Sequence, residues 1–186
     1  MSRSARWFAA AAVAGVAAVA LAIVLVTSAG SGRGRNAPGL PAQAPGQSFS
    51  NPAIGVNGRL SAGWSAVTGP RFVQLRSPDG TAVIFIFSPG QALTASQLVA
   101  TELASIQKGY TGVSIARPAG SSLGGLPAKS RVVTGRNVHG VPIRVLIIGA
   151  RGTGRNYVLQ AVTAERAPVQ DLNQTQRIVQ SLRLTG

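Results

Sequence analysis

The chain has 186 residues, with 18 Lys and Arg against 4 Asp and Glu, which gives a formal net charge of +14, and it contains one His and no Cys. The lack of cysteine excludes disulfides, thiolate nucleophiles, iron–sulfur clusters and cysteine-ligated zinc. Because only four carboxylates and one imidazole are present, few side chains could carry out acid–base catalysis.

A long apolar run follows the first six residues. From Trp7 to Val26, twenty consecutive residues carry no charge, which in a helix is enough to cross a hydrocarbon core of about 30 Å. Signal-peptide apolar regions are shorter, roughly 7 to 15 residues. We therefore expect a cytoplasmic tail at 1–6 and an uncleaved transmembrane signal anchor at 7–26. The alternative is a secretory signal peptide that is cleaved near Ala29 and releases the protein.

The next segment has the composition of a linker. Residues 27–52 contain five Gly, four Pro and four Ser, and only Leu40 and Phe49 could enter an apolar core. Such a composition is typical of a flexible, disordered chain with an end-to-end distance of roughly 28 Å at this length. We therefore expect residues 27–52 to tether the following part of the chain to the membrane.

Residues 53–186 have the length of one ordinary domain. Strands are predicted at 60–67, 71–76, 81–87, 113–116, 128–134, 141–150 and 156–163. Residues 77–80 form a Ser-Pro-Asp-Gly turn that predicts a hairpin between the second and third strands. Because the strands at 81–87 and 141–150 are apolar on both faces, we expect them in the middle of a sheet that is covered twice.

The first predicted helix begins at Thr94, which forms a capping box with Gln97. Its apolar stripe consists of Leu98, Val99, Leu103 and Ile106. Lys108 provides a basic last turn and Gly109 a C-cap, and both are typical of a helix end.

The second predicted helix spans residues 168–182. Pro168 lies near its start, and Asp171 lies in the first turn, where a carboxylate favours the positive end of the helix dipole. Its predicted buried side consists of Val169, Leu172, Val179 and Leu182.

The predicted order is three strands, a helix, four strands and a helix, and the short connections require antiparallel neighbours. This pattern predicts an α+β domain with an antiparallel sheet and a helix on each face. The order, with Gly63-Trp64, the stretch from Arg71 to Gly80 and the terminal Ser181 to Leu184, resembles the PsbP-like fold of extrinsic photosystem subunits and of many small exported actinobacterial proteins. The resemblance implies a non-catalytic accessory or adaptor module.

Four features invite a chemical interpretation, and each has a simpler structural one. Residues 120–124 match the G-x-S-x-G nucleophile elbow around Ser122, but no helix signal follows, so we expect a flexible loop. The Gly152-Thr153-Gly154 segment lies between two strands and predicts a hairpin turn rather than a dinucleotide site. His139 lies in a polar turn without other metal ligands nearby, and Trp64 is expected to be a core anchor. No cofactor or metal is predicted.

The exported part of the chain is strongly basic. Residues 53–186 contain 14 basic and 4 acidic side chains, a formal charge of +10, and such a surface attracts anions. Export removes nucleic acid from reach, so we do not expect it as a partner. A cell-envelope protein, an anionic envelope polymer or lipid headgroups are the expected partners, although composition bias and solubility would also account for the charge.

One group of residues goes beyond scattered charge. If the hairpin of 128–134 with 141–150 closes between Gly135 and Gly140, Arg131 lies opposite Arg144 and Lys129 opposite Leu146. The next hairpin then brings Gln160 to the same place, and Lys129, Arg131, Arg144 and Gln160 share one face. Two facing arginines repel unless they hold an anion or a carboxylate of a partner. We therefore predict an anion-binding or partner-binding site at these four residues.

These observations favour a non-enzymatic, single-pass membrane protein whose C-terminal domain lies outside the cytoplasm and binds another envelope component. The alternative is an anion-binding or small-ligand-binding module that uses the basic sheet face.

Overall fold

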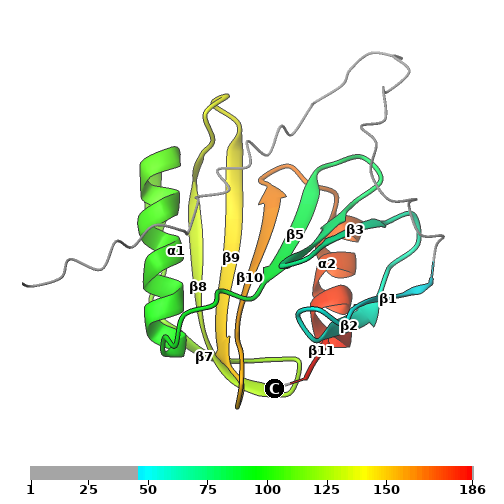
Figure 1. Ribbon diagram of the computed structural model, residues 1–186. Coiled ribbons are helices and arrows are strands. Elements are labelled where there is room, and N and C mark those ends of the chain that lie inside the picture. The colour runs from blue at the N-terminus through cyan, green and yellow to red at the C-terminus, as the bar shows by residue number, and fades with distance from the viewer. Residues whose placement is uncertain (1–45, 186) are drawn as a thin grey trace, which may run out of the picture.

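The computed structural model describes residues 46–185, which form two antiparallel sheets and two helices (Figure 1). The main sheet contains β3 (Ser65–Gly69), β4 (Phe72–Arg76), β5 (Ala82–Phe87), β10 (Asn156–Ala164), β9 (Pro142–Arg151), β8 (Leu126–Arg136) and β6 (Thr111–Ile115) in that spatial order, with β7 (Ala119–Leu123) also paired to β8. The small sheet contains β1 (Ser48–Asn51), β2 (Val56–Arg59) and β11 (Arg183–Leu184). The predicted α+β architecture is thus confirmed for these residues.

The helices are α1 (Ala95–Gly109) and α2 (Val169–Ser181). The Thr94 capping box is present in full, with the Thr94 hydroxyl accepting from the Gln97 N–H and the Gln97 side chain accepting from the Thr94 N–H. The helix extends through Gly109, and Tyr110 rather than the predicted Gly109 is its C-cap.

The segment predicted to be a linker ends earlier than expected. Strand β1 occupies residues 48–51, and the Phe49 side chain is buried in the main core. The folded part therefore includes residues that precede the predicted boundary at residue 53. The predicted tail at 1–6, the anchor at 7–26 and the linker up to residue 45 lie outside the described residues. Among residues 46–185, neither helix has the length and hydropathy that a bilayer crossing requires.

The two faces of the main sheet carry separate apolar cores, one on each side. The larger core lies on the α2 face and includes Trp64, Ile84, Ile148, Leu159 and Ile178. The smaller core lies under α1 and joins Val99 and Ile106 to Val133, Val145, Ile147 and Val162. Alternate residues of β9 and β10 enter opposite cores, so the prediction of a central strand covered on both faces is confirmed for β9. Strand β5 is also central, but it adds buried residues to the larger core only, and Phe85 and Phe87 on its other face are half-buried, so the prediction holds there only in part.

Helix α1 packs on β8, β9 and β10, whereas α2 contacts β2 and β5 (Figure 1). The approach of α1 depends on Gly149, because a Cβ atom at this position would lie 2.6 Å from the Ala95 carbonyl oxygen and 3.0 Å from Leu98 Cβ. The Asn156 amide donates to the Gln91 carbonyl at 2.6 Å and holds the connection before α1 against β10. The first turns of α1 therefore lie close to the sheet.

Helix α2 buries a side that matches the predicted one only in part: Leu182 is buried and Val179 packs against the larger core, as predicted. Its buried residues are Asp171, Gln174, Thr175 and Ile178. Val169 and Leu172, which were predicted to be buried, are 71% and 41% exposed. Two polar contacts account for this rotation: Trp64 Nε1 donates to Gln174 Oε1 at 2.8 Å, and Thr81 Oγ1 donates to Asp171 Oδ2 at 2.7 Å. Buried polar groups generally need such partners, so these two bonds favour this side of the helix facing inward. The buried Thr175 Oγ1 atom has no hydrogen-bond partner among the described residues.

Candidate binding site

The hairpin of β8 and β9 has a different register from the predicted one. Arg131 lies opposite Ile147, and Arg144 lies opposite Thr134. The strands extend to the Arg136–Pro142 pair because Asn137 closes the turn: its Oδ1 atom accepts from the N–H groups of His139 and Val141 at 3.0 Å each. The shift is three residues, an odd number, so it moves Arg144 to the other face of the sheet. The predicted pair of facing arginines is therefore wrong.

Three of the four predicted site residues do share the α1 face. The register places Lys129 opposite Gly149 in one row across the sheet. Arg131, Ile147 and Gln160 lie in the next row, since Ile147 pairs with both of its neighbours. Arg144 is exposed on the opposite face. The α1 face is thus the place where the predicted basic residues come together, with Gln160 two strands away from Arg131.

Gln160 has a partner inside the domain. Its Nε2 atom donates to Glu102 Oε2 of α1 at 2.5 Å, and both residues lie between the helix and the sheet. Sequence analysis missed Glu102, which is only 8% exposed although carboxylates are rarely buried to this extent. Burial raises the pKa of Glu102, while the hydrogen bond from Gln160 offsets part of that increase. The Gln160 side chain therefore forms a hydrogen bond inside the domain.

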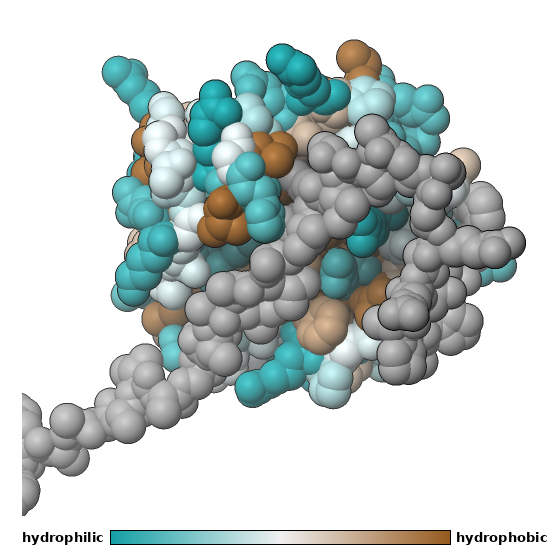
Figure 2. Space-filling model, turned by 90° about the horizontal axis from the view of Figure 1, so that it is seen from above, coloured by the Kyte–Doolittle hydropathy of each residue, from teal (hydrophilic) through white to brown (hydrophobic). Residues whose placement is uncertain are grey.

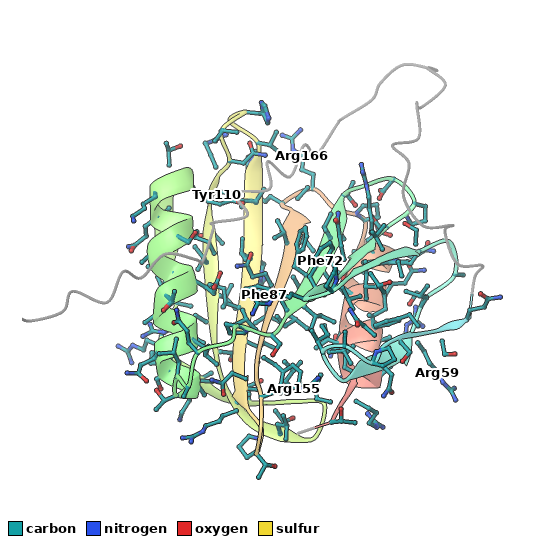
Figure 3. All side chains as sticks on the ribbon, viewed as in Figure 1. Arg59, Phe72, Phe87, Tyr110, Arg155 and Arg166 are labelled. Atoms are coloured by element: carbon teal, nitrogen blue, oxygen red, sulfur yellow. The ribbon has the colours of Figure 1, made fainter. Side chains whose placement is uncertain are left out.

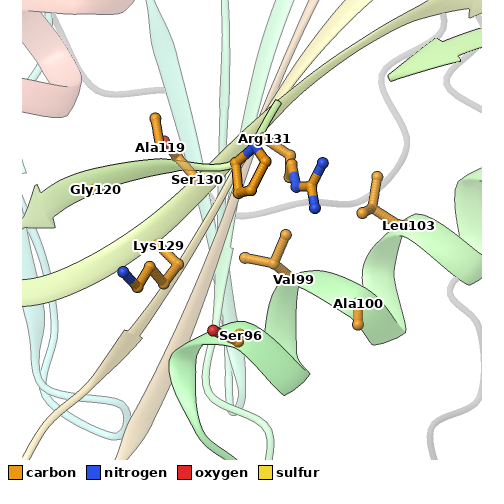
Figure 4. A pocket seen from close by; sticks show the side chains of 10 residues that line it. Ser96, Val99, Ala100, Leu103, Ala119, Gly120, Lys129, Ser130 and Arg131 are labelled. Carbon is orange, nitrogen blue, oxygen red and sulfur yellow. The ribbon is translucent and has the colours of Figure 1, made fainter. Parts of the chain in front are cut away.

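Lys129 and Arg131 instead line a pocket of about 370 Å³ between α1, β7 and β8. Figure 4 shows both side chains extending from β8 on the side of α1, with Val99 and Leu103 facing them from the helix. The Arg131 Nη1 atom donates to the Ala116 carbonyl at 2.9 Å, which holds the guanidinium at the edge of the pocket. The pocket thus brings two basic groups and an apolar helix surface together.

The other half of this sheet face presents aromatic side chains. Phe72 of β4 pairs with Phe87 of β5, and Phe85 and Val67 lie in the next row on the same face. Phe72 is 37% and Val67 38% exposed, whereas Phe85 and Phe87 are half-buried. Figure 3 shows Phe72 and Phe87 near each other and away from α1. We call Val67, Phe72, Phe85 and Phe87 the open aromatic face.

The sequence does contain a pattern that indicates the open aromatic face. Phe85 and Phe87 alternate along one strand, and Phe72 begins the strand before it. The hairpin turn between these strands fixes which aromatic residues become neighbours across the sheet. Periodicity could not predict that α1 would pack mainly on β8, β9 and β10.

Two carboxylates, Asp79 and Asp171, lie together at one end of the sheet. Asp79 Oδ1 accepts from the Ser77 hydroxyl at 2.8 Å and from the Thr81 N–H at 3.0 Å. Burial raises the pKa of Asp79, but these hydrogen bonds outweigh it and leave the pKa below its ordinary value. Burial and the nearby Asp79 raise the pKa of Asp171, against the hydrogen bond from Thr81. This network joins the turn before β5 to the start of α2.

The motifs examined for catalysis adopt ordinary structural roles. The segment around Ser122 forms β7 rather than the expected loop, and β8 rather than a helix follows it. The elbow geometry, which needs a helix after the serine, is therefore not formed. His139 is exposed in the β8–β9 turn, and Gly152 donates to the Arg155 carbonyl in the predicted hairpin turn. Trp64 is 1% exposed, which confirms its role as a core anchor.

Hydrophilic residues are spread over the surface seen in Figure 2, and the apolar residues form small separate areas between them. The basic residues of the described chain are likewise distributed over several elements. The charge itself therefore does not identify a site, and the two halves of the α1 face remain the features with a defined geometry.

No protein-family model matches the chain, and no curated protein matches it either. Solved structures do. The solution structure of cyanobacterial PsbP (CyanoP) from Synechocystis is 12% identical with a TM-score of 0.57, and the match covers 77% of this chain and 94% of that one. The domain has the PsbP-like fold.

Two further structures share the PsbP-like fold of this chain. LpqN, described as involved in cell envelope biogenesis of Mycobacterium tuberculosis, is 13% identical with a TM-score of 0.52, and the match covers 76% of this chain and 86% of that one. The Ran-binding protein Mog1p of Saccharomyces cerevisiae is 8% identical with a TM-score of 0.53, and the match covers 76% of this chain and 96% of that one. At these identities the likeness concerns the fold alone.

Proposed function

We propose that this protein is a membrane-tethered, extracytoplasmic, non-enzymatic accessory domain that binds a protein of the cell envelope through the open aromatic face. The observation that carries the proposal is the cluster of Val67, Phe72, Phe85 and Phe87 on the half of the sheet that α1 leaves uncovered. Aromatic residues that are grouped and half-exposed are the usual anchors of protein interfaces.

The descriptions of two proteins of similar fold support this proposal. Proteins of the same fold include one that binds Ran and one described in cell envelope biogenesis. The apolar segment at residues 7–26 and the linker composition after it favour a tether that places the domain outside the cytoplasm. The partner would be an envelope protein whose apolar surface is edged with acidic residues, because the described domain carries 14 basic and 4 acidic side chains.

The chemistry of the described residues also favours binding over catalysis. Residues 46–185 contain no group of three or more His, Asp or Glu side chains that could hold a metal ion. Asp79 and Asp171 are occupied by the hydroxyl groups of Ser77 and Thr81, and the exposed His139 lies in a turn at the end of the β8–β9 hairpin. Their placement supports structural roles for these groups.

Site-specific photo-crosslinking in intact cells tests the proposal. A benzophenone amino acid replaces Phe72 in the full-length chain, and the matched control carries it at Leu172, which is 41% exposed on the opposite side of the domain. We expect one discrete adduct from position 72 that is absent from position 172. The adduct should disappear when Phe87→Ser is added, provided that the variant keeps its circular dichroism spectrum.

Two results would contradict the proposal. The first is the same adduct from both positions, which would show that crosslinking reports crowding in the envelope rather than this surface. The second is an adduct from position 72 that survives both Phe87→Ser and Val67→Ser, because a partner seated on the open aromatic face must lose contacts in these variants.

A further inference from the structure

The pocket beside α1 combines two chemically different walls. One wall is apolar and consists of Val99, Ala100 and Leu103 from α1. The other wall carries Lys129 and Arg131, and no carboxylate lines the pocket. Figure 4 shows Val99, Ala100 and Leu103 on the helix side and Lys129 and Arg131 on the strand side, where Ala119 also lies.

The basic wall is arranged so that both charges point to the same side. Lys129 and Arg131 are two residues apart on β8, so their side chains leave the same sheet face about 7 Å apart. Arg131 uses Nη1 for the Ala116 carbonyl, which leaves its other N–H groups for a ligand. This anchoring limits the freedom that the guanidinium would lose on binding.

The start of α1 adds to the positive potential. Ser96, the second residue of the helix, lines the pocket, and Gly149 lets this end of α1 approach the sheet closely. The amino end of a helix carries a partial positive charge. Glu102, the carboxylate on the same helix, faces Gln160 rather than the pocket. Asp79 and Asp171 lie together at the β4–β5 turn, outside the pocket lining.

We infer that this pocket binds a small amphiphilic anion, with a carboxylate or phosphate head on Lys129 and Arg131 and a short apolar body against Val99 and Leu103. A volume of about 370 Å³ suits a ligand of this size. Neither the anionic head nor the apolar body alone would contact both walls. A free inorganic anion would leave the apolar wall without a contact, and a neutral apolar molecule would leave Lys129 and Arg131 without an anionic partner. The inference is independent of the proposed protein partner, since it uses the other half of the α1 face.

The sequence offers an internal control for testing this pocket. Lys129 and Lys108 are the two lysines of the chain, and Lys108 lies in the last turn of α1, away from the pocket. Full-length protein in phosphatidylcholine nanodiscs is acetylated with and without octyl phosphate or octanoate, and both lysines are followed by mass spectrometry. At a probe concentration of about twice its Kd, acetylation of Lys129 should slow roughly threefold, with no change at Lys108.

Inorganic phosphate and octanol test the two walls separately. Each should protect Lys129 much less than octyl phosphate does at the same concentration. The comparison of octyl phosphate with octanoate distinguishes a phosphate head from a carboxylate head. Equal protection by inorganic phosphate, or by octanol, would overturn the inference of an amphiphilic anion.

Matched variants separate the pocket from the overall charge. Arg131→Ala should raise the concentration of octyl phosphate needed for protection by about tenfold, because a charge-assisted hydrogen bond is lost. Arg144→Ala removes the same charge from the opposite sheet face and should leave the concentration unchanged. If both variants weaken protection equally, only general electrostatic attraction is at work, and the inference is wrong.

A second pair of variants avoids any loss of packing. Ser96→Glu places a negative charge at the pocket, and Thr101→Glu places the same charge on an exposed position of the same helix outside it. Ser96→Glu should weaken protection of Lys129 severalfold more than Thr101→Glu. Equal effects, or protection of Lys129 and Lys108 to the same extent, would overturn the inference.

Discussion

The two faces of the main sheet differ in how completely they are covered. On the α2 face, 21 buried residues form one core that extends from β3 to β8 and is closed by α2 and the small sheet. On the α1 face, the buried cluster has seven residues, and α1 packs mainly on β8, β9 and β10. The α1 face holds the buried Glu102, the basic pocket and the open aromatic face. One face thus supplies most of the stability, and the other supplies the surfaces that can bind.

This division follows from the chemistry of each face. Apolar burial contributes roughly 25 cal/mol per Å² of area removed from water, so the larger core dominates folding. The α2 face also holds buried polar groups in internal hydrogen bonds, as the bond between Trp64 and Gln174 shows, although the buried Thr175 Oγ1 atom has no partner among the described residues. On the α1 face, Lys129 and most of the Arg131 donors have no hydrogen-bond partner within residues 46–185 that would compete with a ligand. Substitutions on the two faces should therefore have different consequences.

The largest effect is expected at the centre of the α2 face. Trp64→Ala should lower the free energy of unfolding by about 4 kcal/mol, because it leaves a large cavity and removes the donor to Gln174. Val67→Ala, three residues along the chain on the open aromatic face, should cost less than about 1 kcal/mol since that side chain is already 38% exposed. Urea denaturation of both variants measures the contrast, and similar losses would contradict the division between the two faces.

A smaller effect is expected where α1 meets the sheet. Gly149→Ala should lower the free energy of unfolding by about 2 kcal/mol, because the added Cβ would lie 2.6 Å from the Ala95 carbonyl oxygen and push the helix outward. Gly120→Ala is the matched control: Gly120 lies in the same row of the sheet, and a Cβ there meets nothing within 4 Å. Thermal unfolding of the pair checks the prediction. A control as unstable as Gly149→Ala would show that general strand effects, not helix approach, decide the outcome.

The smallest effect is expected at Glu102 and has the opposite sign. Burial raises the pKa of Glu102 in the folded state, so the ionised side chain destabilises the fold. The contribution of Glu102 to stability is therefore most favourable below its unfolded pKa. This contribution is lost as the pH rises through the raised folded pKa. Glu102→Gln should therefore increase stability at pH 7 by about 1 kcal/mol. The gain should shrink toward pH 4, where the native side chain is also neutral.

The comparison for Glu102 is made at each pH between the variant and the parent protein. This removes the contribution of Asp79, whose lowered pKa destabilises both proteins in the same way as pH falls through it. A gain that is independent of pH would show that the ionisation of Glu102 is not its cause. A loss at pH 7 would show that the carboxylate bonded to Gln160 is needed for packing.

Much of the fold could be predicted from local patterns. The capping box at Thr94, the turn before β5 and the apolar alternation of β5 and β9 each produce structure through neighbouring residues, so they were predicted correctly. The strands β1, β2, β7 and β11 were missed because they are short and lack a clear apolar alternation. Of these, β1 and β2 pair in a local hairpin, β7 pairs locally with β8, and β11 pairs with the distant β2. The predicted strand at 60–67 was accordingly placed too early, since β3 begins at Ser65.

The candidate site shows the same limit. Sequence analysis selected Lys129, Arg131, Arg144 and Gln160, and the structure brings Lys129 and Arg131 together in one pocket. The error of three residues in register arose because the Asn137 side chain, rather than the flanking glycines, closes the hairpin. Arg144 moved to the other face as a result, and Gln160 found Glu102.

The amino-acid sequence by itself determined the composition of the chain, the apolar segment at 7–26, the two helices and the central strands, because charge, hydropathy and local periodicity are properties of neighbouring residues. Only the tertiary structure decided which side of α2 is buried, how far α1 reaches across the sheet and which basic residues face one pocket. These depend on hydrogen bonds and contacts between residues far apart in the chain, such as Trp64 with Gln174, and no local pattern contains them.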